Sequence, residues 1–175
     1  MTAQTGPTVP VNPAVADLER RAVPPPSGYS ASTQSPSHGE SPAQFDQDAG
    51  QTGASTAIGF LGGYSASYDS VASNESVQLV LSEFASADGA TTFDSLAPSV
   101  NGEAPSLSPI TSKLSTISGS EVLIGTKADS QGFYTAELIF QKAIYVCVLE
   151  YFNDSPISSL PPVLAQAAAQ QYSRL

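Results

Sequence analysis

Residues 133–152 read FYTAELIFQKAIYVCVLEYF, and this stretch decides the fold. Two apolar runs, 133–141 and 144–152, are separated by a tight connection at Gln141-Lys142-Ala143. Runs rich in aromatic and β-branched residues are typical of strands, and a short connection makes the pair antiparallel. One face of the first strand carries Tyr134, Ala136, Leu138 and Phe140, and one face of the second carries Ile144, Val146, Val148 and Glu150. The stretch therefore predicts a central antiparallel hairpin.

Three more strands are expected outside this hairpin. Residues 76–84 alternate strictly, with Val77, Leu79 and Leu81 on one face and the more polar Gln78, Val80 and Ser82 on the other. A shorter strand is expected at 121–127. Residues 58–68 combine aromatic residues with Gly59, Gly62 and Gly63, which predicts a glycine-weakened or bulged strand. The prediction is an antiparallel sheet of about five strands.

Two helices are expected against this sheet. The apolar spacing after Asp88 predicts a short amphipathic helix that Pro98 ends, followed by a surface loop to residue 120. The alanine- and glutamine-rich segment 161–175 predicts a C-terminal helix packed across the sheet. Strands and helices that do not alternate regularly indicate the α+β class.

The N-terminal third has a different composition. Residues 1–56 are rich in Pro, Ser, Gln, Gly and Thr, which predicts a largely irregular segment. Residues 1–23 are expected to form a flexible tail and residues 24–56 a segment that wraps on the single domain, 57–175. Two short helices are expected within it, one capped by Asn12 with Pro13 in its first turn and one starting at Ser41-Pro42.

Composition excludes several classes of function. The chain has 175 residues, with Lys+Arg 6 against Asp+Glu 16 and a formal net charge of -10, so it offers no basic surface for nucleic acid. One Cys and one His supply neither an internal disulfide nor the usual zinc ligands. We expect no cofactor and no metal site. No apolar run reaches the roughly 20 residues of a membrane-spanning helix, and the first residues lack a signal-peptide pattern.

Several short motifs stand out along the chain: Gly59-Phe60, Gly63-Tyr64, Glu83-Phe84, Gly132-Phe133-Tyr134 and the final Ala-Gln-Gln-Tyr-Ser-Arg-Leu. Together they resemble the pattern of uncharacterised actinobacterial envelope proteins and lipoproteins. The resemblance covers about residues 24–175 and implies a Mog1/PsbP-like α+β fold. It also implies a secreted or envelope-associated protein if a leader was removed, and the chain is otherwise expected in the cytoplasm. Such proteins often carry a lipid-attachment cysteine near the N-terminus, whereas Cys147 lies in a predicted strand.

The sequence offers little for catalysis, and we expect no enzyme. His38 lies in the Pro/Ser-rich segment, where a general base would be poorly positioned. Cys147, between two valines, is typical of a buried structural thiol. Strand positions Glu83, Glu137 and Glu150 could form a carboxylate pair, although solvated strand positions are the simpler interpretation.

The favoured hypothesis is a non-catalytic binding or assembly domain of the cell envelope on a flexible spacer. The expected binding residues are Phe60, Tyr64, Tyr68, Tyr134 and Glu137. The expected partner is another protein or an envelope component.

Two alternatives stay open at this stage. One is an oligomeric structural subunit whose N-terminal arm docks on a neighbouring chain. The other is a small-ligand binder or carboxylate enzyme with a pocket between the sheet and the C-terminal helix.

Overall fold

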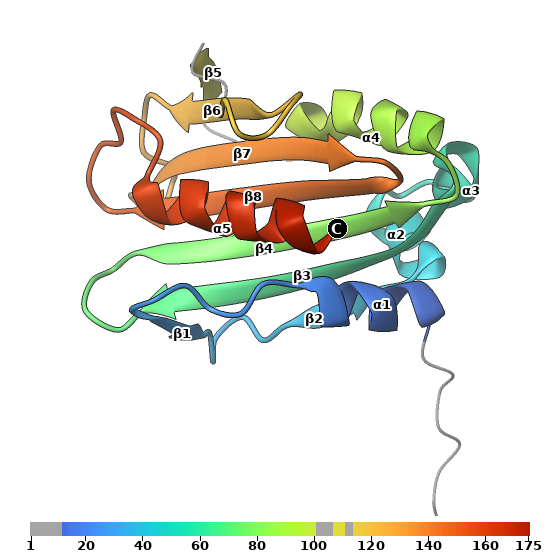
Figure 1. Ribbon diagram of the computed structural model, residues 1–175, viewed down its shortest axis with the longest axis horizontal. Helices are drawn as coiled ribbons and strands as arrows, with labels where there is room; N and C mark the ends of the chain where they lie inside the picture. Colours follow the sequence, from blue (N-terminus) through green and yellow to red (C-terminus); the bar gives the residue numbers. More distant parts are fainter. Residues whose placement is uncertain (1–11, 101–106, 111–113) are drawn as a thin grey trace, which may run out of the picture.

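The protein is built on one antiparallel sheet with helices on both faces (Figure 1). The computed structural model describes residues 12–100, 107–110 and 114–175. Over these residues the sheet has eight strands in the order β1-β3-β4-β8-β7-β6-β5, with β2 also paired to β3. The strands are β1 (Tyr29–Ala31), β2 (His38–Glu40), β3 (Phe60–Ser70), β4 (Ser76–Phe84), β5 (Leu107–Ile110), β6 (Glu121–Gly125), β7 (Tyr134–Lys142) and β8 (Tyr145–Asn153). The predicted α+β class is confirmed.

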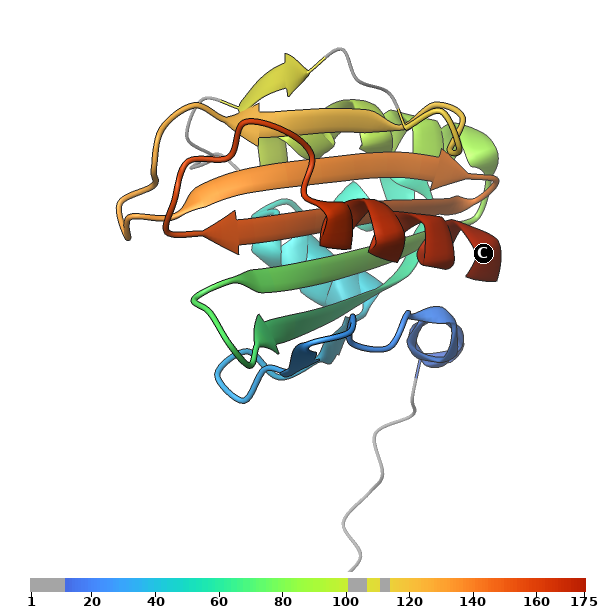
Figure 2. The same cartoon turned by 60° about the vertical axis from the view of Figure 1, so that its left-hand side comes forward.

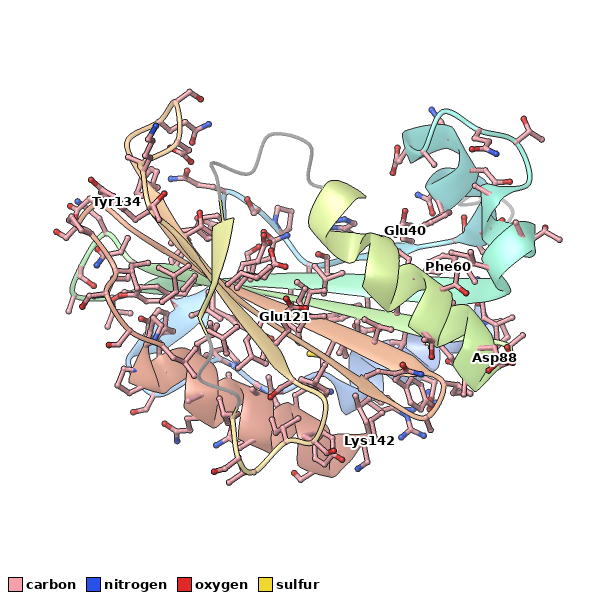
Figure 3. The ribbon with its side chains drawn as sticks, turned by 90° about the horizontal axis from the view of Figure 1, so that it is seen from above. Glu40, Phe60, Asp88, Glu121, Tyr134 and Lys142 are labelled. Atoms are coloured by element: carbon pink, nitrogen blue, oxygen red, sulfur yellow. The ribbon has the colours of Figure 1, made fainter. Side chains whose placement is uncertain are left out.

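The helices divide between the two faces. They are α1 (Pro13–Arg21), α2 (Pro42–Asp48), α3 (Ala54–Ile58), α4 (Ala87–Val100) and α5 (Pro162–Arg174). Helices α1 and α5 lie on one side of the sheet and α2, α3 and α4 on the other (Figures 2 and 3). We call these sides the α5 face and the α4 face. Two separate apolar clusters correspond to them.

The central hairpin forms as predicted, with its turn one residue later. β7 and β8 join through Ala143 and Ile144, and Phe140 lies opposite Cys147. This register places the apolar side chains of β7 and β8 together on the α5 face: Leu138, Phe140, Cys147 and Leu149 are fully buried. The alternate residues therefore point to the α4 face.

Apolar packing covers most of the α5 face, apart from a hollow of about 330 Å3 beside Tyr64 and Tyr68. Leu79 and Leu81 of β4 are fully buried there, as the alternation predicted. Helix α5 covers them with Leu164, Ala167 and Ala168, so the predicted C-terminal helix is confirmed. Small alanine side chains let a helix lie close to a sheet, and this face carries the larger part of the core.

Part of the expected tail packs against the sheet instead. Helix α1 begins at the predicted cap, where the Asn12 side chain accepts a hydrogen bond from the backbone N–H of Ala14. Its Leu18 packs into the core and is fully buried, with 0% of its surface exposed to solvent. A Cβ at Gly39 would collide with Val15, so glycine at this position allows α1 to approach β2. The sequence argument missed this because one apolar stripe on a short helix is a weak signal.

Helix α5 holds the end of α1 through a buried amide. Gln171, which is fully buried, accepts from the N–H of Val23 and donates to the carbonyl of Arg21. Arg174 donates to the carbonyls of Arg20 and Arg21. We call these contacts the α1–α5 clasp. They satisfy the carbonyl groups that the end of a helix leaves unpaired.

The sheet is larger than the five strands expected, because three short strands lie at its edges. β1 and β2 come from the segment expected to be irregular, and β5 comes from the expected loop 98–120. β5 contains Pro109, a residue that edge strands tolerate. Helix α4 also continues two residues beyond Pro98, which therefore does not end it.

Candidate functional site

The α4 face carries a groove of about 450 Å3. Its floor is the central part of β4 and β8. It consists of Gln78, Val80, Ser82, Val148 and Glu150. These are the residues that alternate with the fully buried leucines of the α5 face, so one alternation produces both the core and the floor.

The walls come from α2, α4 and β2. Phe45 and Asp48 lie on α2, Phe93 on α4 and Glu40 at the end of β2. Figure 3 shows Glu40 between α4 and the α2–α3 corner, on the side of the sheet opposite α5. The groove thus combines two aromatic side chains with three carboxylates. Mixed linings of this kind, with a few polar groups among apolar ones, are typical of ligand sites.

Local hydrogen bonds fix the α2 wall. Helix α2 begins with the predicted Ser41 cap, a capping box in which the side-chain oxygen of Gln44 accepts a hydrogen bond from the backbone N–H of Ser41. The carboxylate of Asp46 then accepts from the N–H groups of Gly53, at 2.8 Å, and Ser55, at 2.7 Å. These bonds lower the pKa of Asp46 and tie α2 to α3.

An aromatic cluster closes one end of the groove. The Phe45 ring stacks on Phe60 with ring centroids 4.5 Å apart, and it lies 6.2 Å from the Phe93 ring. The Phe84 ring packs against both Phe60 and Phe93, with ring centroids 5.8 Å and 5.2 Å apart. The two aromatic walls are therefore supported by buried rings of β3 and β4.

Helix α4 is anchored to the hairpin and to α3. Gln141 donates to the carbonyl of Ala87, and the hydroxyl of Thr91 lies 3.0 Å from the Gln141 side-chain oxygen. A Cβ at Gly89 would collide with the carbonyl oxygen of Ile58, so glycine allows the close approach of α4 to α3. These contacts set the position of Phe93 over the sheet.

Two carboxylates lie side by side on this face. Glu137 of β7 is directly opposite Glu150 of β8, and Gln78 of β4 follows on the other side of Glu150. Side chains opposite each other in an antiparallel pair have Cβ atoms about 5 Å apart. Glu137 is only 2% exposed. It is therefore not the solvated strand residue of the simpler sequence interpretation.

The environment of these carboxylates favours their neutral forms. Burial, and then the neighbouring Glu150 and Glu121, raise the pKa of Glu137 to about 7. Burial also raises the pKa of Glu150. The pKa of Glu40 is raised by burial and by Asp48, an effect that His38 partly opposes. Negative charge in the groove is therefore costly, and no lysine or arginine among the described residues lines it.

A second hollow of about 460 Å3 continues from the groove. The two share Gln78, whose side-chain nitrogen lies 3.5 Å from the Ser65 hydroxyl. The second hollow is lined by His38, Ser65 and Ser67 together with the 35–37 loop. A ligand longer than the groove would therefore meet hydroxyl groups at this end.

The predicted aromatic binding strand is divided between the two faces. A bulge between Phe60 and Gly62 shifts the pairing of β3 with β4, so Phe60 points to the α4 face. Tyr64 and Tyr68 pack in the α5-face core, where the Tyr68 hydroxyl donates to the carbonyl of Val23 at 2.7 Å. Among the three, only Phe60 contacts a groove residue, Phe45.

The other predicted residues are also separated. Tyr134, at the far end of the sheet from Phe60 in Figure 3, lies opposite Asn153. Glu137 lies next to the groove through Glu150. Glu83, the third strand glutamate, pairs with Tyr145 on the α5 face, so it cannot act with the other two. The five expected residues therefore do not form one surface.

Neither the nucleophile candidate nor the base candidate lines the groove. Cys147 is fully buried on the α5 face, and burial raises the pKa of its thiol, as expected of a structural cysteine. His38 is exposed on β2, beside the second hollow. Among the residues that the structure describes, no three His, Cys, Asp or Glu side chains are grouped to hold a metal ion. Over the same residues no helix is long and apolar enough to cross a membrane.

Sequence reasoning missed the α2 wall and Glu40. Both lie in the segment expected to be irregular, and the pairing of Glu40 with Gly63 is a long-range contact that no local pattern indicates. The groove floor could be predicted from the sequence, because the polar alternation of β4 already separated Gln78 and Ser82 from the leucines.

Comparisons with known proteins leave the family open. No family model matches the chain, and no curated protein matches it. Among solved structures, the extracellular domain of PknH from Mycobacterium tuberculosis is similar, with a TM-score of 0.48 and 14% sequence identity. The alignment covers 95% of this chain and 91% of that chain. At this level the likeness carries no functional conclusion, and the resemblance to actinobacterial envelope proteins stays a prediction.

Proposed function

We propose that the protein is a non-catalytic binding domain whose ligand occupies the α2–α4 groove. The observation that carries the proposal is the groove itself, a concavity of about 450 Å3 with two aromatic walls, Phe45 and Phe93. Its volume falls within the range of small-molecule sites, roughly 300–1,000 Å3. The expected location outside the cytoplasm remains part of the proposal and is supported by the sequence resemblance.

The rigidity of the walls supports binding. Phe45, Phe60 and Phe93 are packed against one another, and α2 and α4 are tied to neighbouring elements by hydrogen bonds. A preformed site loses little conformational entropy when a ligand binds. The groove therefore needs no large rearrangement to accept its ligand.

A carboxylate enzyme is the second candidate. The cross-strand pair Glu137 and Glu150, with the pKa of Glu137 raised to about 7, is the kind of pair that can divide acid and base roles. Binding is favoured because Glu137 does not line the groove and the nucleophile candidate Cys147 is on the other face.

The oligomer alternative is less well supported. Its N-terminal arm was to dock on a neighbouring chain, but α1 packs on the sheet of its own chain through Leu18 and the α1–α5 clasp. Any such arm would have to come from residues 1–11, which lie outside the described residues.

A fragment screen by 1H–15N NMR tests the proposal. The library contains cations, anions, neutral glycosides and apolar compounds in equal numbers, and the full chain is used. We expect the hits to shift amides of Gln78, Val80, Phe93 and Glu150. Hits that map only to the α5 face, or a library without hits, would overturn the proposal. Turnover of any hit would favour the carboxylate enzyme instead.

A further inference from the structure

The basic side chains that the structure describes lie away from the groove. Of the basic side chains that the structure describes, Arg20, Arg21 and Arg174 gather at the α1–α5 clasp. Lys142 lies beside them, with its ammonium group donating to the carbonyl of Tyr172 and 4.6 Å from the Tyr172 ring centroid. Lys127 lies in the loop between β6 and β7. None of the described lysines and arginines lines the groove.

The groove, by contrast, gathers carboxylates. Glu40, Asp48 and Glu150 lie in its lining, and Glu137 stands next to Glu150. Glu137 is 98% hidden from solvent, and its partner across the strand pair is the carboxylate of Glu150. Carboxylates held close together in a partly buried place repel one another, so a positive charge placed beside them is favoured.

The remainder of the lining is apolar. Phe45 and Phe93 form two walls, and Val80 and Val148 form the middle of the floor. Aromatic faces attract cations through their quadrupole, and they also cover apolar carbon. A metal ion does not match this lining, because no three ligand side chains are grouped in the described residues.

We infer that the groove recognises an organic cation, an ammonium group carried on an apolar skeleton, with Glu40 and Glu150 pairing the charge and Phe45 and Phe93 covering the skeleton. The inference rests on the proposed function and names the class of ligand for that site. Binding such a cation relieves the repulsion between neighbouring carboxylates, which an anionic or neutral ligand of equal shape does not.

The same lining predicts selectivity against anions. A carboxylate ligand would enter a site with three negative groups and no described lysine or arginine in its lining. Like charges placed together in a partly buried site repel strongly. The charge of a ligand should therefore affect its affinity for the groove more strongly than its shape does.

The test is a titration of the full chain with three compounds that share one skeleton: 4-phenylbutylamine, 4-phenylbutanol and 4-phenylbutyrate. Affinity is measured by NMR shifts of the groove amides. We expect the amine to bind at least about tenfold more tightly than the alcohol, and the butyrate not to bind. Glu150→Gln and Glu40→Gln should each weaken binding of the amine about fivefold or more and leave the alcohol nearly unchanged.

Glu19→Gln is the matched control. It removes the same charge from an exposed side chain on α1, away from the groove, and should leave amine binding unchanged. Equal weakening by Glu19→Gln would show general attraction to an acidic chain and overturn the inference. Tighter binding of the alcohol or the butyrate, with shifts in the groove, overturns the ligand class and leaves the site standing. If none of the three compounds binds while other fragments shift the groove amides, the inference about the ligand class is wrong and the binding site remains. If the fragment screen also gives no hits, both the inference and the proposed function are wrong.

Discussion

The two faces of β4 and β8 differ although they are made by alternate residues of the same strands. On the α5 face, Leu79, Leu81 and Leu149 are fully buried beneath a helix. On the α4 face, Gln78, Val80 and Glu150 line an open groove. Since the period of a strand is two, one backbone can carry a core and a binding site at once. The stability of the domain comes mainly from one face, and we assign its function to the other.

The largest expected difference between the faces is in stability. Leu149→Ala removes a fully buried side chain from the α5 face and should lower the free energy of unfolding by about 3 kcal/mol. Its neighbour Val148 is only half-buried beside the groove, so Val148→Ala should cost about 1 kcal/mol or less. Urea unfolding of both variants measures the contrast. Equal losses would show that the groove floor is as much a core as the α5 face.

The second effect is a pH dependence of the free energy of unfolding, caused by the titration of Glu137. The pKa of this group is about 7 in the folded protein against 4.5 for the free side chain, so the native state holds a proton that the unfolded chain releases between these values. Stability should therefore fall by up to about 3 kcal/mol as the pH rises from 4.5 to 7. Glu150 and Glu121 are the charges that face Glu137, and both act in the same direction.

Glu137→Gln should remove most of this fall. At pH 8 the variant is expected to be more stable than the native chain by about 1–3 kcal/mol, and near pH 4.5 the two should be equal. Glu19→Gln, on exposed α1, is the control and should follow the native curve. A variant that is less stable at both pH values would show that the Glu137 carboxylate stabilises the fold.

A smaller loss of stability is expected at the α1–α5 clasp, which joins the two helices of the α5 face. Gln171→Met keeps the approximate volume but leaves the N–H of Val23 without its partner, so it should cost about 1–2 kcal/mol. Hydrogen exchange of residues 13–23 should accelerate. Gln170→Met, one residue away and exposed, should change neither quantity. Unchanged exchange in Gln171→Met would mean that α1 is held by Leu18 packing alone.

The smallest effect concerns Cys147. Because its thiol is fully buried and its pKa is raised, the native protein should not react with a thiol reagent, and labelling should follow global unfolding in urea. Rapid labelling of the folded chain would show that the α5 face opens locally.

Prediction from sequence succeeded where the pattern is local. The alternation in 76–84 placed one central strand and its buried face, the hairpin at 133–152 placed two more strands, and the caps at Asn12 and Ser41 placed two helices. Each of these depends on residues close together in the chain. The expected face of the second hairpin strand was wrong, because Cys147 and Leu149, and not Val146 and Val148, lie with Leu138 on the α5 face.

It was less successful where long-range contacts decide. Helix α1 approaches β2 closely because Gly39 leaves room for Val15. The bulge at Phe60 turns that ring to the opposite face from Tyr64 and Tyr68. The groove joins side chains from five separate elements, so no single segment indicates it. Glu137 was named as a candidate, but only the sheet register shows that it faces Glu150.

The most direct test of the central claim compares methyl groups on the two faces. In a methyl-labelled sample, addition of 4-phenylbutylamine is expected to shift the signals of Val80 and Val148, which line the groove. The signals of Leu79 and Leu149, their neighbours on the same strands, should stay in place because they are buried on the other face. Shifts confined to the leucines, or equal shifts on both faces, would contradict the assignment of function to the α4 face.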